Sequence, residues 1–230
     1  MKLILLPGMD GTGILYESFR AALSPDVELC PVRYPPDKIL GYDELEKLAA
    51  AALPHDEPFI LLGESFSGSI AIRLAAQKPS GLRGLILCCT FAKDPIRLAG
   101  LFRHLPRLAL IESIVLFLLG KIVLGKFSTP ALVSLLREAA SQVSPAVLRH
   151  RARAALFIDT SAALHAINVP ALYLQATHDR LIPRCAVRHI QKHLPAIEIM
   201  PIHAPHCLLQ ANPTAAATAI FQWLSAEHLM

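Results

Sequence analysis

The sequence predicts an α/β fold in which a mostly parallel, six-stranded sheet is flanked by helices and carries one helical insertion. Six short apolar runs bounded by Gly or Pro are typical of strands buried on both faces of a parallel sheet. Segments with apolar residues at helical spacing lie between several of these runs, which is the alternation of α/β proteins. The alternation stops between Cys89 and Val169, where no strand-like run occurs.

The individual elements follow from these patterns. Strands are expected at residues 3–6, 27–32, 59–62, 85–89, 171–176 and 197–202. Helices are expected at residues 42–53, 67–77, 185–193 and 214–224. Because a helix that joins two parallel strands forms a right-handed crossover, this order of elements favours one mostly parallel sheet.

The segment without strands is predicted to be a helical insertion. Thr129-Pro130 and Ser144-Pro145 each place a hydroxyl that can cap a helix before a proline. Helices should therefore cover residues 131–140 and 146–158.

The insertion also sets the expected domain organisation. One or two more helices are expected within residues 101–124, with ends at Gly120 and Gly125. A chain of 230 residues can bury a core as one domain without disulfides or metal. The expected division is a core domain of residues 1–91 and 161–230 and a helical cap subdomain of residues 92–160.

The composition is that of a folded protein with reduced cysteines. The hydrophobic fraction is 53% and the mean hydropathy is +0.45, which excludes a disordered chain. Five cysteines form an odd set without a C-x-x-C spacing, which indicates a reducing compartment and no zinc ribbon. Only four apolar residues follow Met1-Lys2, too few for a secretory signal. The apolar stretch 108–125 is interrupted by Glu112 and Lys121, so no transmembrane segment and a cytoplasmic location are expected.

The segment around Ser65 has the pattern of a nucleophile elbow. An apolar strand beginning at Phe59 runs into Gly63-Glu-Ser65-Phe-Ser67 and then into a helix. This is the context of the G-x-S-x-G motif, in which small residues on either side of the serine let strand and helix approach. Ser67 replaces the second glycine and Gly68 follows it, so a second register has Ser67 as the nucleophile. The end of the strand at Gly63 favours Ser65.

Two later strands place an acid and a base at the same edge of the sheet. Asp179 follows the expected strand 171–176, and His206 follows the expected strand 197–202. A serine hydroxyl is a weak nucleophile until an imidazole takes its proton, and a carboxylate orients that imidazole. The sequence therefore predicts Ser65 as nucleophile, His206 as general base and Asp179 as the orienting acid.

Other residues compete for two of these roles. Asp94, after the expected strand 85–89, is the alternative acid, and His203 is the alternative base. His178 is expected to make only a loop contact.

The order Ser65, Asp179, His206 along the chain resembles that of the α/β-hydrolase superfamily. An Asp-x-x-x-Pro after the penultimate strand, and a histidine with a proline seven residues later, are usual surroundings of the acid and base in that superfamily. Pro205 departs from the commoner glycine before the histidine. The resemblance spans nearly the whole chain except residues 92–160, and it implies the strand order 2-1-3-4-5-6.

The first expected strand is followed by a glycine-rich loop, L-P-G-M-D-G-T-G at residues 6–13. It lacks the P-loop lysine and the G-x-G-x-x-G spacing, so nucleotide binding is not expected. Together with the elbow, this loop is similar to that of a subgroup of small bacterial serine esterases and hydrolases. The resemblance implies that the Met9 and Phe66 N–H groups form the oxyanion hole. The glycines should supply the backbone freedom that the turn requires.

The resemblance implies a serine hydrolase of the carboxylesterase or thioesterase type. The insertion lies where superfamily caps cover the serine, so its apolar residues are expected to bind a hydrophobic acyl group, unless they only pack against the core. These residues are Ile111, Ile114, Val115, Leu116, Phe117, Leu118 and Leu119. Residues 92–160 hold ten Lys or Arg against four Asp or Glu. This charge would attract a small-molecule substrate carried on coenzyme A or an acyl carrier protein, or an acidic lipid surface, unless it is only a solvated basic face.

Other functions use the same fold. Acyl transfer to an alcohol through the same acyl-enzyme is a close alternative. A non-catalytic ligand receptor typically has a damaged triad, whereas all three positions are filled here. Cofactor-free haloperoxidase or C–C bond hydrolase chemistry is a further alternative, because fold does not fix function. No cofactor, metal or nucleic acid is expected, since no H-E-x-x-H or cysteine-pair spacing occurs, and no oligomeric state follows from the sequence.

Overall fold

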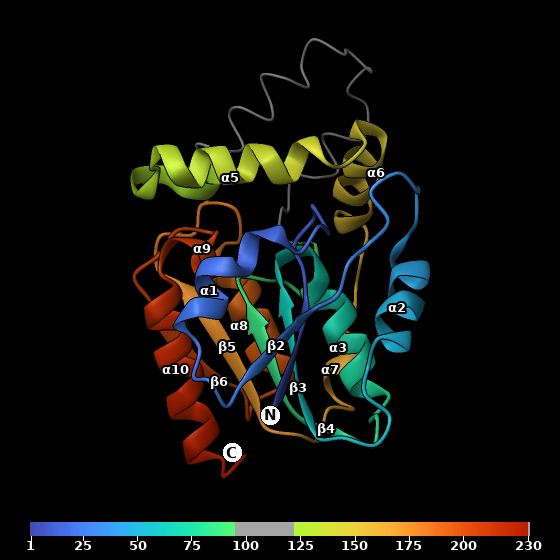
Figure 1. Ribbon diagram of the computed structural model, residues 1–230. Coiled ribbons are helices and arrows are strands. Elements are labelled where there is room, and N and C mark those ends of the chain that lie inside the picture. The colour runs from blue at the N-terminus through green and yellow to red at the C-terminus, as the bar shows by residue number, and fades with distance from the viewer. Residues whose placement is uncertain (95–121, 230) are drawn as a thin grey trace.

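Six parallel strands form one sheet in the order β2-β1-β3-β4-β5-β6 in the computed structural model, which describes residues 1–94 and 122–229 (Figure 1). The strands are β1 (Lys2–Leu6), β2 (Glu28–Pro31), β3 (Phe59–Glu64), β4 (Leu82–Cys88), β5 (Ala171–Ala176) and β6 (Glu198–Ile202). Every neighbouring pair is parallel. The predicted sheet and its strand order are confirmed.

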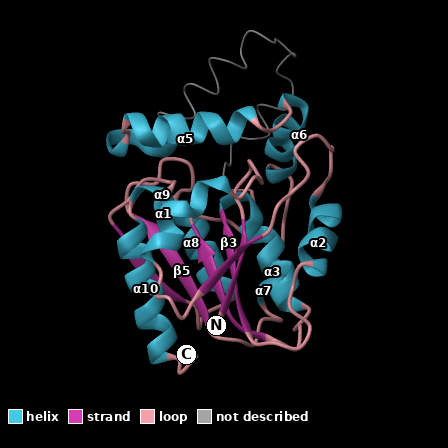
Figure 2. Cartoon of the chain, in the orientation of Figure 1, coloured by secondary structure: helices cyan, strands magenta, loops and turns pink. Residues whose placement is uncertain are grey.

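Helices cover both faces of the sheet (Figure 2). Side chains alternate along each strand, so Leu3 and Leu5 point to one face while Ile4 and Leu6 point to the other. The first face is covered by α1 (Glu17–Ala22), α9 (Leu208–Ala211) and α10 (Pro213–Ala226). The second is covered by α2 (Tyr42–Ala51), α3 (Gly68–Ala76), α7 (Ser161–Leu164) and α8 (Arg184–His193). Burial on both faces explains why the strands read as continuous apolar runs.

The four helices that the sequence predicts outside the insertion are α2, α3, α8 and α10. The helices α1, α7 and α9 were not predicted, and each has only four to six residues. So short a helix shows too few turns for a clear apolar period. Short 3₁₀ segments, η1 (Ile14–Tyr16), η2 (Ser65–Ser67) and η4 (Gly125–Phe127), were also not predicted.

Two helices of the insertion begin where the sequence predicts them, at α5 (Pro130–Ser141) and α6 (Pro145–Ala155). Thr129 caps α5, because its hydroxyl accepts a hydrogen bond from Leu132 N at 3.2 Å. The predicted side-chain cap by Ser144 is wrong. Its hydroxyl accepts no helix N–H, and its own backbone N–H donates to Pro36 O at 2.9 Å, which ties the start of α6 to the loop after β2.

The one or two further helices predicted within residues 101–124 lie largely outside the described residues, as does Gly120. Residues 122–124 are helical, and Gly125 follows them with a φ of 53°. This left-handed conformation suits a glycine at a helix end, as predicted for Gly125.

The helices α5 and α6 lie above the carboxyl edge of the sheet (Figure 1). The helix α5 packs Leu135, Leu136 and Ala139 onto the core. The insertion leaves and re-enters the core at one place, where Lys93 and Asp159 form an antiparallel bridge and their side chains an ion pair of 2.8 Å. No helix among residues 1–94 and 122–229 is long and apolar enough to cross a membrane.

Candidate active site

The strand β3 ends in a strained turn at Ser65. Its φ is +50°, a left-handed conformation that is rare for a residue with a side chain and costs about 1–3 kcal/mol. Two glycines permit the turn. A Cβ on Gly63 would lie 2.6 Å from Ala71 Cβ, and a Cβ on Gly68 would lie 2.0 Å from Thr90 Oγ1. The close approach of α3 therefore depends on Gly68 as well as on Gly63.

Three polar side chains from three strand ends meet at this edge of the sheet. Ser65 Oγ lies 2.9 Å from His206 Nε2, and His206 Nδ1 lies 2.9 Å from Asp179 Oδ2. The His206 and Asp179 side chains are 7% and 6% exposed. Asp179 Oδ1 accepts hydrogen bonds of 2.8 Å from both Leu181 N and Ile182 N, which fixes the carboxylate in place. This chain of contacts lets the imidazole take a proton from the serine while the carboxylate holds its Nδ1–H.

The alternative residues lie elsewhere. The Ser67 hydroxyl is buried and bonds to Pro7 O and, at 3.0 Å, to Tyr34 OH, so it contacts no imidazole. The His203 ring is exposed and packs edge-on against the rings of Phe127 and His178, at centroid distances of 5.1 and 4.5 Å.

The alternative acid, Asp94, lies at the start of the insertion. Asp94 follows the bridge at Lys93, and its backbone N–H donates to Ile158 O at 3.3 Å. The His206 Nδ1 has its 2.9 Å contact with Asp179 instead.

The glycine-rich loop forms a tight turn beside Ser65. Gly11 N donates to Gly8 O at 3.1 Å, and Gly8 N donates to Tyr16 OH at 3.1 Å. Gly11 and Gly13 have φ values of 71° and 76°, whereas Gly8 has no positive φ, so only the former two use the freedom of glycine.

Within the described residues, neither predicted oxyanion donor uses its N–H group in a loop, cap or side-chain hydrogen bond. No loop, cap or side-chain oxygen of residues 1–94 and 122–229 accepts a hydrogen bond from the N–H of Met9 or Phe66. The Phe66 ring stacks on Tyr42 at 4.6 Å, and Tyr42 OH donates to Phe66 O at 3.2 Å. These contacts orient the Phe66 backbone. Both amides remain predicted donors.

A buried carboxyl beside Ser65 was missed by the sequence analysis. Glu64 is 5% exposed, accepts a hydrogen bond from Tyr16 OH and a second, of 3.1 Å, from Gln210 Nε2. Burial raises the pKa of Glu64, although both hydrogen bonds oppose the rise. The signal in the sequence was a carboxyl at the end of an otherwise apolar strand. Through Tyr16, Glu64 supports the Gly8 N–H and thus the loop that holds Met9.

The raised pKa of Glu64 predicts a pH-dependent stability. Because folding favours the protonated form, the stabilising contribution of Glu64 is complete below its ordinary pKa of 4.5 and is lost as the pH rises through its higher folded pKa. The glutamine of Glu64→Gln does not titrate. Gln210 Oε1 has no partner among the described residues, so it can accept a hydrogen bond from the new amide once the Gln210 side-chain amide flips. We expect the stability of the wild type relative to Glu64→Gln to fall as the pH rises above 4.5.

Urea unfolding of both proteins across this pH range measures the difference. Far-UV circular dichroism at each pH checks that both start folded. A difference that grows in favour of the wild type with rising pH would contradict the raised pKa.

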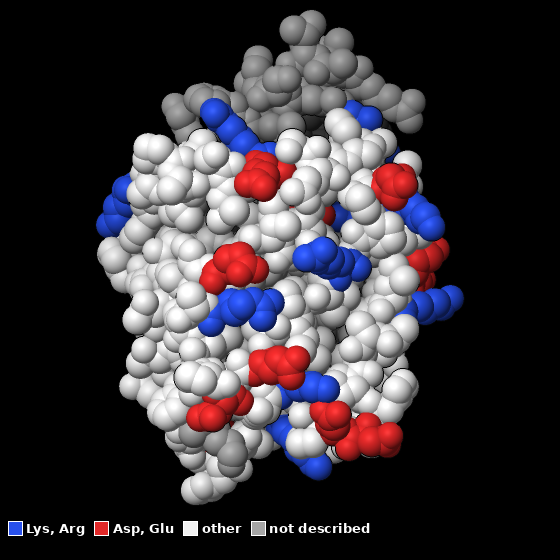
Figure 3. Space-filling view, in the orientation of Figure 1, with Lys and Arg blue, Asp and Glu red and all other residues white. Residues whose placement is uncertain are grey.

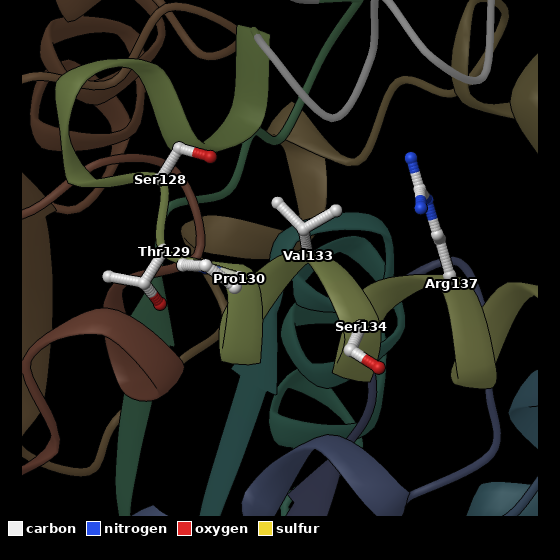
Figure 4. A pocket seen from close by; sticks show the side chains of 6 residues that line it. All are labelled: Ser128, Thr129, Pro130, Val133, Ser134 and Arg137. Carbon is white, nitrogen blue, oxygen red and sulfur yellow. The ribbon is translucent and has the colours of Figure 1, made fainter.

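A hollow of about 450 Å³ on α5 lies apart from Ser65, Asp179 and His206. It is lined by Ser128, Thr129, Pro130, Val133, Ser134 and Arg137 (Figure 4). Figure 4 shows Val133 and Arg137 projecting from α5 away from the strands. None of the triad side chains lines this hollow, so it is not the site described above. Among residues 1–94 and 122–229, no group of His, Cys, Asp or Glu is arranged to hold a metal ion.

Comparisons with known proteins agree with this architecture. A family model described as "Alpha/beta hydrolase family" matches residues 3–219. The structure of MenH from S. aureus aligns with a TM-score of 0.81 and 17% identity, over 99% of this chain and 94% of that one. A structure from a study of carboxylesterases of the thaumarchaeon Nitrososphaera gargenis aligns with a TM-score of 0.79 and 14% identity, over 99% and 90%. The enol-lactonase of Burkholderia xenovorans LB400 aligns with a TM-score of 0.73 and 17% identity, over 97% and 91%. No curated protein matches the chain. At such identities the structural likeness shows the fold alone.

Proposed function

The chain belongs to the alpha/beta hydrolase family, and from this premise we propose that it is a serine hydrolase that cleaves a carboxylic ester or thioester through an acyl-enzyme. The observation that carries the proposal is the continuous contact from Ser65 Oγ through His206 to Asp179, with two distances of 2.9 Å. The strained, positive φ of Ser65 supports it, because such strain collects at functional sites.

The proposed mechanism has two half-reactions. As Ser65 Oγ attacks the carbonyl carbon, its proton passes to His206 Nε2, and Asp179 stabilises the imidazolium that forms. The Met9 and Phe66 N–H groups stabilise the oxyanion of the tetrahedral intermediate. His206 then protonates the leaving alcohol or thiol, which leaves an acyl group on Ser65. Water activated by His206 attacks this ester and releases the acid.

The substrate that we propose has a hydrophobic acyl group. Part of the proposed cap subdomain lies beside the base, since Cys207 N donates to Val123 O at 3.5 Å and Leu124 is fully buried. The apolar residues 111–119, on which the prediction of an acyl-binding cap was based, lie outside the described residues. Packing of the cap next to His206 supports an acyl pocket at this edge of the sheet.

The basic charge of residues 92–160 is less available than its sum indicates. Arg151 is buried and Lys93 pairs with Asp159. On the face shown in Figure 3, acidic and basic side chains are interspersed. A substrate carried on coenzyme A or an acyl carrier protein therefore stays a prediction. A cytoplasmic location also stays a prediction. The substrate that we propose is a small-molecule ester or thioester.

Pre-steady-state kinetics with p-nitrophenyl butyrate, together with fluorophosphonate labelling, test the proposal. We expect a burst of p-nitrophenol equal to the enzyme concentration, because acylation precedes a slower deacylation. Peptide mass spectrometry should locate the label on Ser65. In Ser67→Ala, the label should stay on Ser65, since the Ser67 hydroxyl contacts Pro7 and Tyr34 instead of a base.

Other outcomes would change the assignment. A folded protein with neither burst nor label would contradict the proposal and favour a ligand receptor. A label on Ser67 would show that the nucleophile lies in the second register. An ester product that forms only when an alcohol is added would identify acyl transfer.

A further inference from the structure

A fully buried arginine of the proposed cap subdomain contacts the loop that carries Met9. Arg151 lies on α6, and its side chain is 0% exposed. Its Nη1 donates to Met9 O at 3.0 Å and to Asp10 O at 2.9 Å, and its Nη2 donates to Pro35 O at 3.0 Å. One guanidinium thus joins the cap to two loops of the core.

Burial of this arginine removes water from a charged guanidinium, which is unfavourable for folding. No ion pair among the described side chains includes it, and its Nε has no hydrogen-bond partner there. Burial accordingly lowers the pKa of Arg151. Burial of a charged group without an ion pair lowers stability, and the nearby Asp10 opposes only part of the pKa shift. The contacts that Arg151 makes in return are almost all with backbone carbonyls, which it holds in place.

One of those carbonyls, Met9 O, follows the Met9 N–H in the chain. The Met9 N–H belongs to the peptide whose carbonyl, Gly8 O, accepts from Gly11 N at 3.1 Å. The next carbonyl along the chain, Met9 O, accepts from Arg151 Nη1 at 3.0 Å. With Gly8 N bound to Tyr16 OH, the backbone is fixed on both sides of Met9, and Arg151 is the part of this support that comes from the cap.

The loop is shaped to receive the guanidinium. A Cβ on Gly11 would lie 2.7 Å from Arg151 Nη1 and 2.9 Å from Tyr34 Cβ, so only glycine leaves the space that the arginine occupies. The guanidinium also lies 5.6 Å from the centre of the Tyr34 ring, whose hydroxyl bonds to Ser67 Oγ at 3.0 Å. Arg151 is therefore linked to the elbow through Tyr34, in addition to its direct contacts with the loop.

We propose that Arg151 is a positioning residue of the oxyanion hole, which holds Met9 O so that the Met9 N–H faces the oxyanion that forms on the substrate. This inference rests on the proposed function. It makes the rate of acylation depend on the seating of α6 over the core. A guanidinium suits this position because its planar, divergent N–H groups reach three carbonyls at once, whereas an ammonium is a single point of charge.

The test compares Arg151→Ala and Arg151→Lys with the matched control Arg153→Ala, which removes the same charge from an exposed position of the same helix. Fluorophosphonate labelling taken to completion counts the competent active sites, so that kcat per site is free of losses from misfolding. We expect kcat per site to fall by about 10- to 100-fold in Arg151→Ala, which is less than the largest loss known for removal of a whole oxyanion donor. KM should stay within about threefold of the wild-type value. The kcat per site of Arg151→Lys should lie between those of Arg151→Ala and the wild type, and that of Arg153→Ala should equal the wild-type value.

Two further readouts separate positioning from a structural role. A trifluoromethyl ketone forms an adduct with serine that carries an oxyanion. Its inhibition constant should rise by the same factor by which kcat/KM falls, because both report binding of the tetrahedral species. Methylguanidinium should restore part of the rate of Arg151→Ala by occupying the vacated space.

The opposite results would overturn the inference. A kcat per site in Arg151→Ala within about threefold of the wild type, or an unchanged inhibition constant of the ketone, would refute a positioning role while leaving the hydrolase proposal intact. Absence of a burst and of labelling in the wild type would refute the proposed function and this inference together.

Discussion

Ser65→Ala is expected to lower kcat for p-nitrophenyl butyrate by about 10⁵- to 10⁶-fold and to abolish the burst, because removal of a nucleophile from a triad leaves only binding and oxyanion stabilisation. The substitution deletes the Oγ that lies 2.9 Å from His206 Nε2. Alanine carries a Cβ as serine does, so the strain at a φ of +50° is the same in both proteins. The fold should therefore be retained while the acyl-enzyme is lost. Rapid-mixing kinetics measure both quantities.

Thermal unfolding of Ser65→Ala provides the control, since a melting temperature near that of the wild type attributes the loss to chemistry. Fluorophosphonate labelling should also vanish. Turnover of more than about one per cent of the wild-type rate in purified Ser65→Ala would show that another group attacks the substrate.

Asp179→Asn is expected to lower kcat by about 10⁴-fold without unfolding the protein. The asparagine Oδ1 can still accept from the N–H groups of Leu181 and Ile182, which now bind Asp179 Oδ1 at 2.8 Å. Its NH₂ group would then face His206 Nδ1, where the carboxylate Oδ2 lies at 2.9 Å. A donor at this position favours the tautomer with the proton on Nε2, and that nitrogen cannot take the Ser65 proton.

Asp94→Asn is the matched control, because Asp94 was the alternative acid and lies after β4. Its kcat should stay within about threefold of the wild type. Steady-state kinetics of both variants, from the same preparation, decide between the two carboxyls. A large loss in Asp94→Asn together with a small loss in Asp179→Asn would reverse the assignment.

The sheet and the positions of the triad residues could be predicted because each rests on a local pattern. An apolar run shorter than a helix marks a buried strand, and the residue that follows it lies at the carboxyl edge whatever the rest of the chain does. Ser65, Asp179 and His206 each follow such a run. Three independent local patterns were therefore enough to place three side chains at one edge of the sheet.

The support around the triad could not be predicted, since it consists of contacts between distant parts of the chain. Arg151 and Met9 are 142 positions apart, and Tyr16 and Glu64 are 48 apart. Nothing in the spacing around Arg151 separates it from its exposed neighbour Arg153. Only packing shows which arginine enters the core.

The bridge between Lys93 and Asp159 closes the neck of the insertion, with Thr160 N donating to Ala92 O at 2.7 Å beside it. The chain leaves and re-enters the core at this one place, and the sheet continues on both sides of it, although α5 and Arg151 also hold the segment to the core. If this segment binds the acyl group, as we propose, its exchange between relatives would change which acyl groups are accepted while the core stays the same. A transplanted segment that lacked an arginine equivalent to Arg151 would bring new specificity with a slower first step. Selection on this segment would then act on acyl specificity and on the rate of acylation at the same time.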